Sequence, residues 1–498
     1  MRGLKAIALL AMALPLAPAR AEPYPPAGSL IHWRSYAPEA FKAAKEQHKP
    51  ILVLISASWC HWCHEFETRS LETPEVAALL NDHFVPVCVD ADRRPDVVAR
   101  YPGRGLPETV IVNPAGGVEV AVPGAIPKED LVRNLRQTVA ILSEAHGSVV
   151  ETVSTPHANR IEPVRLLTAA RQRLEVETDP LFRGFSQGAK LPKPEVLLFL
   201  LGGNAGERRQ AIETMEAVTG EVPWLKALGN HGLYDPVEGG FFRYATRRNW
   251  SEPHDEKLLG LNAEILRVCL AIYRQTGDRR AKAWATSTIG YMLRTLRAPP
   301  GGFYGSQAAD EAYYRLSGPE RRRRQPPSID RHHYADSSAK AAIALFEAAR
   351  VLRHGSYRAE ARRVLEDIER YLRADGAMAH DWSDGRSSDL VGMLDDQAWA
   401  AMAFQAGYAT THAVRYRSEA EQALRYVERN LRTENGYRLH AGGEVCSRQN
   451  GEIALAFAQA GPARYEAARL ALRLGLGADL DGAYGWQAAR ILAGTHAR

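Results

Sequence analysis

Trp59-Cys60-His61-Trp62-Cys63-His64 follows the apolar run Ile51–Ser56 after two small residues. The apolar run contains β-branched residues and predicts a buried strand, and the residues after it predict a helix. Two cysteines three positions apart at a helix start lie on the same side of the helix. A helix N-terminus stabilises a thiolate, so this arrangement predicts a redox-active dithiol.

The beginning of the chain predicts a secretory signal over residues 1–21. Arg2 and Lys5 give a positive start, residues 6–17 form an apolar core too short to span a bilayer, and Ala19-Arg20-Ala21 is a small-x-small cleavage site. The mature chain is therefore expected to begin near Glu22. Its expected location is periplasmic or secreted, where disulfides persist.

Composition indicates a soluble protein of more than one domain. The 498 residues exceed one ordinary core, and 45% hydrophobic with 24% charged residues is typical of globular chains. The formal charge of +5 includes three positive charges of the leader, so the mature chain is nearly neutral. Nucleic-acid partners are not expected, and no later apolar run is long enough to span a membrane. Of the five cysteines, Cys88 and Cys269 are expected to be buried free thiols, and Cys446 is isolated.

Residues 22–147 predict an α/β domain. Helices are expected at 37–47, 60–80 and 128–143, and strands at 50–56, 83–90, 109–113 and 117–122. This β-α-β-then-β-β-α order is that of the minimal thioredoxin fold. Pro107 stands just before the third strand, where that fold carries a cis-proline facing the cysteines. A trans turn proline is the alternative.

The thioredoxin fold suggests a role for each residue of the motif. Cys60 is expected to be the exposed, attacking thiolate and Cys63 the resolving thiol. Partly protonated His61 would stabilise the Cys60 thiolate, His64 flanks the pair, and Trp59 packs beside it. The buried acid that thioredoxins use to move the resolving proton would fall at Leu54, which cannot titrate. His61 is therefore expected to take over proton transfer, or turnover is slow.

The same residues are also compatible with two other chemistries, haem attachment and zinc binding. Cys60, Cys63 and His64 also spell the Cys-x-x-Cys-His pattern of covalent haem attachment. A strand-to-helix setting and the lack of an obvious second axial ligand argue against haem. Zinc is disfavoured because four ligands within five residues cannot close a tetrahedron. The expected cofactor set is therefore none beyond the cysteine pair, with no metal; a structural or inactive cysteine pair is a further alternative.

Residues 148–498 predict an all-α domain. Turns that join glycine to an aromatic residue recur with two amphipathic helices between them, for example 257–274 and 279–297. The turns are Arg183–Phe185, Gly239–Phe242, Gly301–Tyr304, Gly376–Trp382, Asn435–Tyr437 and Asp481–Tyr484. About twelve helices in six pairs predict an (α/α)6 toroid of the six-hairpin glycosidase type. An open helical solenoid is the alternative.

The turns at one mouth of such a toroid carry aromatic, imidazole and carboxylate side chains. The candidate substrate-binding residues are Trp250, His254, Glu256, Tyr304, Asp310 and Asp396. Aromatic faces with paired carboxylates suit a sugar ring and acid–base chemistry. The competing interpretation is that the acids stabilise helix starts and the aromatics simply pack. The basic run Arg321–Arg324 is expected to be a solvated loop, with docking of an acidic partner as the alternative.

Several motifs together resemble one known family. They are Cys60–His64, Val89–Asp96, Arg183–Phe185, Lys190–Pro192, Gly232–Asp235, Gly239–Tyr244, Trp250–Leu258, Gly301–Tyr304 and Leu394–Asp396. The combination resembles spermatogenesis-associated protein twenty and its bacterial relatives. This resemblance implies a thioredoxin-like domain followed by an α/α toroid, which is similar in fold to six-hairpin glycosidases and N-acylglucosamine epimerases.

The expected function is thiol–disulfide exchange with protein thiols or disulfides, or with a redox partner, and with the toroid as recognition module. A carbohydrate-binding or carbohydrate-modifying toroid with an accessory redox domain is the alternative. A non-catalytic scaffold that binds clients is the third possibility.

Overall fold

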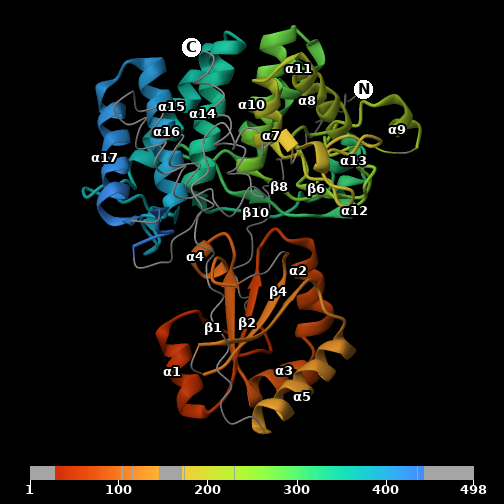
Figure 1. The fold of residues 1–498 in the computed structure, drawn as a ribbon, viewed down its shortest axis with the longest axis vertical. Helices are drawn as coiled ribbons and strands as arrows, with labels where there is room; N and C mark the ends of the chain where they lie inside the picture. Colours follow the sequence, from red (N-terminus) through yellow and green to blue (C-terminus); the bar gives the residue numbers. More distant parts are fainter. Residues whose placement is uncertain are drawn as a thin grey trace, which may run out of the picture.

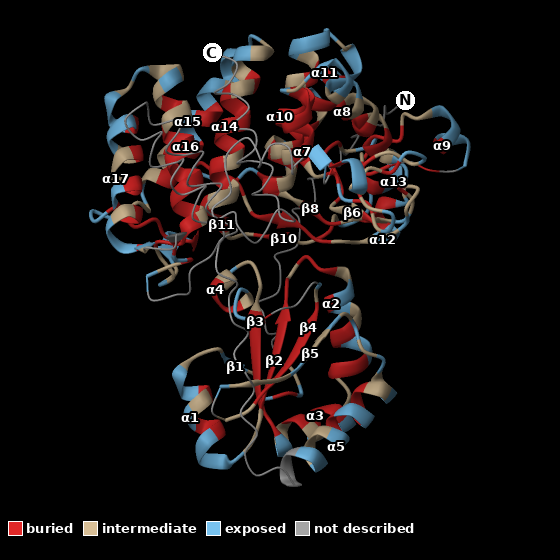
Figure 2. Cartoon of the chain, in the orientation of Figure 1, coloured by how far each residue is buried: buried red, intermediate tan, exposed pale blue. Residues whose placement is uncertain are grey.

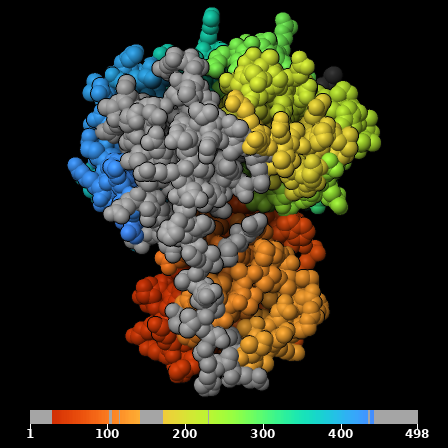
Figure 3. Space-filling model, in the orientation of Figure 1, coloured from red at the N-terminus to blue at the C-terminus, as the bar shows by residue number. Residues whose placement is uncertain are grey.

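The computed structural model describes residues 28–441 except 102–104, 115, 145–170, 173, 229, 231 and 434–435. An α/β domain and a larger helical domain meet at a narrow waist (Figures 1 and 3). The predicted signal segment 1–21, the predicted boundary at 147/148 and Cys446 lie outside the described residues. None of the helices in the described part combines the length and apolar character needed to span a bilayer.

A five-stranded sheet in the order β1-β3-β2-β4-β5 is the centre of the α/β domain. The fully buried β2 (Ile51–Ser56) is parallel to β3 (Val85–Asp90) and antiparallel to β4 (Glu108–Val112). The edge strands are β1 (Arg34–Ser35) and β5 (Val118–Pro123). This strand order and these strand directions confirm the predicted thioredoxin-like fold. Apolar residues on both sides of β2 require cover on both faces of the sheet.

Helices cover both faces of this sheet. Alternate β2 residues pack in two separate apolar clusters, one toward α1 (Pro38–Gln47) and α4 (Pro95–Val98) and one toward the other helices. Those are α2 (His61–Phe66), α3 (Pro74–His83) and α5 (Lys128–Glu144). The central strands β2, β3 and β4 are almost entirely buried, the edge strands β1 and β5 are more exposed, and α1, α2, α3 and α5 show exposed outer faces (Figure 2). The cysteine motif lies at the start of α2, at the end of the domain that faces the helical domain (Figure 1).

The predicted continuous helix over 60–80 is wrong. Helix α2 ends at Phe66, a π-helical turn follows over Glu67–Leu71, and α3 begins at Pro74. Pro74 has no backbone N–H and its ring blocks a preceding helical turn, so the chain must break before it. Proline is well tolerated in the first turn of the new helix, where no hydrogen bond is lost.

The helical domain consists of antiparallel hairpins. The described hairpins are α7 (Pro194–Leu201) with α8 (Ala205–Val218), α10 (Leu259–Thr276) with α11 (Arg279–Tyr291), α14 (Ala335–Val351) with α15 (Gly355–Glu369), and α16 (Leu394–Thr411) with α17 (Val414–Asn430). Helices α7, α10, α14 and α16 contact one another in that order as an inner row. Their partners form the outer row (Figure 1). The expected helix at 484–495 and most of the one at 159–176 fall outside the described residues.

Short elements gather between the hairpins. They are α9 (Pro223–Ala227), β6 (Tyr244–Ala245), β7 (Pro253–His254), β8 (Lys257–Leu258), β9 (Ser306–Gln307), α12 (Glu311–Tyr314), α13 (Gly318–Arg321), β10 (Ile329–Asp330), β11 (His333–Tyr334), β12 (Asp381–Ser383), β13 (Arg386–Ser387), β14 (Arg432–Thr433) and β15 (Gly436–Tyr437). Strand β9 pairs with both β8 and β10. Strands β8 and β10 lie at the end of the helical domain that faces the α/β domain (Figure 1).

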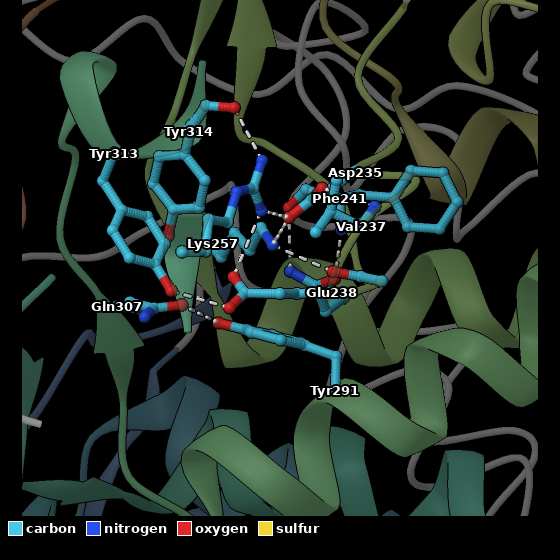
Figure 4. A network of polar contacts seen from close by, with 12 residues as sticks. Asp235, Val237, Glu238, Phe241, Lys257, Tyr291, Gln307, Tyr313 and Tyr314 are labelled. Atoms are coloured by element: carbon cyan, nitrogen blue, oxygen red, sulfur yellow. Dashed lines mark hydrogen bonds and ion pairs between the residues drawn. The ribbon is translucent and has the colours of Figure 1, made fainter. Parts of the chain in front are cut away.

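A buried charge network holds β8 in place (Figure 4). The fully buried Lys257 ammonium donates to Asp235 Oδ2 at 2.6 Å and to the Gly239 carbonyl at 2.9 Å. Arg321 donates to the same Asp235 oxygen at 2.7 Å and to Glu238 at 3.2 Å. The expectation of a solvated 321–324 loop is therefore wrong for Arg321, which is buried. Successive side chains of an extended chain point to opposite sides. Because Lys257 points into this network, the neighbouring Glu256 side chain points away from it, toward the α/β domain.

Candidate functional site

The two cysteines of the motif form a disulfide at the start of α2. Cys60 and Cys63 have Cα atoms 5.3 Å apart and their sulfurs are bonded. Cys60 occupies the N-cap position, and its Sγ accepts a hydrogen bond from the Cys63 N–H at 3.3 Å. The Leu106–Pro107 peptide is cis, as predicted, and Leu106 packs against the cysteine pair. Cys88 and Cys269 are buried and form no disulfide, also as predicted.

The disulfide is buried between the two domains, so the expectation of an exposed Cys60 is wrong. Cys60 is 1% exposed and Cys63 is 0% exposed. The apolar cluster around them includes Ala308 and Leu258 from the helical domain. Their side chains occupy the side of the motif that solvent reaches in an isolated thioredoxin-like domain. A folded protein client therefore cannot reach the sulfurs in this docked arrangement.

Trp59 connects the motif to both domains. Its indole N–H donates to the Asp92 carboxylate of its own domain. Its backbone carbonyl accepts a hydrogen bond from the Ala309 N–H at 3.3 Å, across the interface. The Arg243 guanidinium of the helical domain lies 4.5 Å from the centre of its ring, which is a cation–π distance. The predicted packing of Trp59 beside the cysteines is thus extended by the helical domain.

His254 and Glu256 of the helical domain contact the cysteine motif directly. The Glu256 Oε1 atom accepts a hydrogen bond from the His61 backbone N–H at 3.2 Å. The Trp62 indole N–H donates to His254 Nε2 at 3.0 Å. An indole can only donate, so Nε2 accepts and the imidazole proton sits on Nδ1, which lies 3.4 Å from Glu256 Oε1. His254 therefore donates to Glu256, and together they join the toroid to the cysteine motif.

A buried carboxylate does follow the cysteines by one helical turn, although Leu54 cannot supply it. Glu67 is 8% exposed and its Oε1 accepts a hydrogen bond from the Ser56 hydroxyl at 3.1 Å. It follows Cys63 by one helical turn, so both are on the same side of the chain. Its spacing from Cys63 was a visible signal that the sequence interpretation did not use. His64 is exposed, and the His61 ring lies edge-on to Trp62 with centroids 5.1 Å apart.

A second part of the interface is a cavity of about 340 Å³ between the α/β domain and the helical domain. Its polar lining includes Asp92, Tyr334, Asp336, Lys340, His380 and Asp396. His380 bridges the domains: Nε2 faces the Asp92 carbonyl oxygen at 2.6 Å and Nδ1 faces Asp396 Oδ2 at 2.9 Å. Burial alone lowers the pKa of His380, but Asp396 and the carbonyl outweigh it and raise this pKa to about 10. His380 is therefore a cation, with both ring N–H groups donating.

Of the predicted sugar-binding residues, Asp396 lines this cavity, and the others lie elsewhere. Trp250 is fully buried and its indole N–H donates to the Phe182 carbonyl at 2.8 Å, so it is a core residue. Asp310 caps α12 by accepting from the Tyr313 N–H at 2.8 Å. Tyr304 packs edge-on to His333. Core packing and helix capping use these three side chains, and none of them lines the cavity described above.

The raised pKa of one interface carboxyl group, that of Asp92, predicts that the free energy of unfolding decreases as pH rises. Burial, followed by the charge of Asp90, raises the pKa of Asp92 to about 7 from 3.8. The folded protein then holds a proton that the unfolded chain has lost, so this contribution is complete below pH 3.8 and is lost as pH rises through 7. Asp92→Asn, which keeps an uncharged oxygen for Trp59, should flatten the pH dependence of unfolding free energy between pH 4 and 7. The exposed Asp82→Asn serves as control, and identical profiles for all three proteins would contradict the assignment.

Comparisons with known proteins agree with this architecture. Residues 26–110 match the Thioredox_DsbH family, described as a protein of unknown function, DUF255. Mouse spermatogenesis-associated protein 20 is 30% identical over 314 residues, which are 56% of this chain and 39% of that protein. The human protein is 30% identical over 328 residues, 59% of this chain and 40% of that protein. The chain thus matches about two fifths of the length of these curated relatives.

A solved structure supports the fold of the helical domain. Cellobiose 2-epimerase from Spirochaeta thermophila superposes with a TM-score of 0.52 at 13% identity, over 66% of this chain and 96% of that chain. The class is therefore a thioredoxin-like domain joined to an α/α toroid of the six-hairpin glycosidase type. More particularly, the chain is similar in sequence to spermatogenesis-associated protein 20, as the sequence motifs predicted.

Proposed function

We propose that the α/β domain performs thiol–disulfide exchange, with Cys60 as nucleophile and Cys63 as resolving thiol. The observation that carries this proposal is the Cys60–Cys63 disulfide at the start of α2. Exchange needs the two sulfurs within bonding reach and a thiolate at the first position, and a helix start favours that thiolate. The cysteine pair is the only redox group that the reaction requires.

The exchange proceeds through a mixed disulfide. A client thiolate attacks Cys60 Sγ, the bond to Cys63 breaks, and Cys63 leaves as a thiolate that takes up a proton. A second client thiol attacks the client sulfur of the mixed disulfide, which releases Cys60 as a thiolate and the client as a disulfide. Two electrons pass from the client, which is oxidised to a disulfide, to the protein; the reverse sequence reduces a client disulfide. Glu67, one turn beyond Cys63 and buried, is the carboxylate placed to exchange the Cys63 proton.

The partners proposed for this reaction are protein thiols and disulfides in the periplasm or outside the cell. The toroid acts as the recognition module, since its short strands and loops cover the cysteine pair. Because the sulfurs are buried, a protein client gains access when the two domains separate. A small thiol needs a smaller opening and should therefore react faster.

The proposed exchange is testable with the purified full-length mature protein. Dithiothreitol should convert it to a form in which two additional thiols react with an alkylating reagent, detected as added mass. The reduced protein should reduce a model disulfide, and the oxidised protein should oxidise a model dithiol. A protein that takes up no alkyl groups after reduction, or exchanges with neither reagent, contradicts the proposal.

A carbohydrate-binding toroid is the second candidate, favoured by the interdomain cavity. Its volume of about 340 Å³ and its carboxylate lining suit a polyhydroxylated ring. The superposed epimerase is named for cellobiose, and it shares the fold of the helical domain. Cellobiose or mannose binding, measured by calorimetry, should survive Cys60→Ala and be lost in Asp396→Asn. The absence of heat from either sugar with the unaltered protein would remove this candidate.

A further inference from the structure

Glu256 is a buried carboxylate of the helical domain that contacts the cysteine motif. It is 0% exposed, and its Oε1 atom accepts from the His61 N–H at 3.2 Å. Its Oε2 atom accepts no hydrogen bond from the described residues and lies 3.9 Å from Arg243 Nε. The His61 nitrogen belongs to the peptide bond that links Cys60 to His61, so the Glu256 carboxylate contacts the backbone directly after the proposed nucleophile.

The carboxylate is negatively charged at neutral pH. Burial raises the pKa of Glu256, but the His254 hydrogen bond and the Arg243 charge outweigh burial and hold it below its ordinary value. The nearby Asp255 adds a second acidic group, whose pKa burial and Glu256 raise to about 7. The local field at Cys60 therefore contains the Glu256 charge, partly offset by Arg243.

This charge acts differently on the oxidised and reduced states. The disulfide is uncharged, so a neighbouring carboxylate costs it little. The Cys60 thiolate is an anion, which a buried carboxylate disfavours. Docking of the helical domain thus adds a repulsive charge next to the start of α2.

We propose that Glu256 is a working part of the redox centre: from the helical domain, it suppresses the Cys60 thiolate and holds the pair as a disulfide while the domains are docked. This inference rests on the exchange function proposed above. Reduction consumes two electrons and two protons from an external dithiol, breaks the Sγ–Sγ bond and leaves two thiols. The next step, loss of the Cys60 proton to solvent, is the one that Glu256 opposes.

Linkage makes the effect reciprocal. If docking disfavours the thiolate by a given factor, ionisation of Cys60 weakens docking by the same factor. The reduced, ionised protein should therefore open more readily and expose Cys60 to a client. The oxidised protein remains closed, which protects the disulfide from indiscriminate reduction. The helical domain then controls when the redox site is accessible as well as which client it recognises.

Two variants with opposite expected effects test the inference in the full-length reduced protein. Glu256→Gln keeps the size of the side chain but removes its charge, and should raise the acid dissociation constant of the Cys60 thiol about tenfold. Arg243→Gln leaves the carboxylate without its cation and should lower that constant. The constant is read from the pH dependence of the rate of iodoacetamide alkylation at Cys60. At pH values above the Cys60 thiol pKa of both proteins, a tenfold change also raises the reduction potential of Glu256→Gln by about 30 mV relative to wild type.

Glu252→Gln is the matched control. Glu252 lies in the same loop, four residues earlier, but is exposed and pairs with Arg247. It should leave the thiol constant and the potential unchanged. Small-angle scattering should show a larger radius of gyration for the reduced protein at pH 9 than for the oxidised protein, and Glu256→Gln should narrow that difference.

The outcomes separate this inference from the proposed function. Wild-type protein that does not exchange thiols at all defeats the function itself. Wild-type protein that exchanges, with Glu256→Gln and Arg243→Gln both leaving the alkylation profile unchanged or shifting it in the same direction, defeats the role of Glu256 alone. Opposite shifts cannot come from general loosening of the interface, so they support the electrostatic mechanism even where one variant is less stable.

Discussion

Cys60→Ala is expected to abolish thiol–disulfide exchange and leave only the rate of the uncatalysed reaction. Cys60 is the N-cap of α2 and its Sγ accepts a hydrogen bond from the Cys63 N–H, whereas Cys63 lies within the first turn of the helix. Without Cys60 no sulfur remains at the start of the helix to attack a client disulfide. The measurement is the exchange rate with a model disulfide, with the retained fold checked by circular dichroism.

The variant of the second cysteine, Cys63→Ala, is expected to give a different result. Cys63→Ala keeps the nucleophile but removes the thiol that releases it, so a mixed disulfide with the client should accumulate and be visible as added mass. Cys269→Ala is the control, because that thiol is fully buried in the helical core and burial raises its pKa far above the ordinary value. Equal exchange rates for Cys60→Ala and Cys269→Ala would refute the assignment of the nucleophile.

Asp235→Ala is expected to lower the free energy of unfolding by about 3–5 kcal/mol, the cost of leaving a buried charge without its partner. Asp235 is fully buried and accepts from both Lys257 at 2.6 Å and Arg321 at 2.7 Å. Its removal leaves two buried cations that only Glu238 partly compensates. Urea unfolding followed by tryptophan fluorescence measures the loss, using the transition of the helical domain where the two domains unfold separately.

A surface ion pair supplies the control for this variant. Glu421 is partly exposed and pairs with Arg417 and Arg425 one helical turn away on α17. Pairs of this kind contribute about 1 kcal/mol or less, so Glu421→Ala should change stability little. Equal destabilisation by Asp235→Ala and Glu421→Ala would show that the network around Lys257 is not a major source of stability. Lys257 directly follows Glu256 in the chain. Loss of the network should therefore also displace Glu256 and change the acid dissociation constant of the Cys60 thiol.

The order of elements was readable from the sequence because it depends on local patterns. The helices predicted at 257–274 and 279–297 correspond to α10 and to α11 with its π-helical extension. The period of apolar residues and the glycine turns specify such hairpins over short distances. The break before Pro74 was also local and could have been predicted. The cysteine pair and its cis-proline were predicted by the same kind of reasoning, from spacing alone.

The assignment of polar residues to the site was less successful. Trp250, Asp310 and Tyr304 have residue types suited to a sugar site, yet packing and capping use them. His254 and Glu256 were grouped with them and instead contact the cysteine motif. A residue type at a helix start does not reveal which way its side chain points. That direction depends on neighbours contributed by other hairpins.

Taken alone, the amino-acid order was sufficient for the two-domain architecture, the dithiol motif and the kinship with spermatogenesis-associated protein 20. Those features rest on interactions between residues close along the chain. The buried state of the disulfide rests on contacts between distant ones: Glu256 meets His61 across 195 positions, and His380 meets Asp92 across 288. No periodicity or spacing encodes such pairs, because docking two folded domains brings them together. Folding in three dimensions therefore turned an expected exposed thioredoxin-like site into one that the toroid covers.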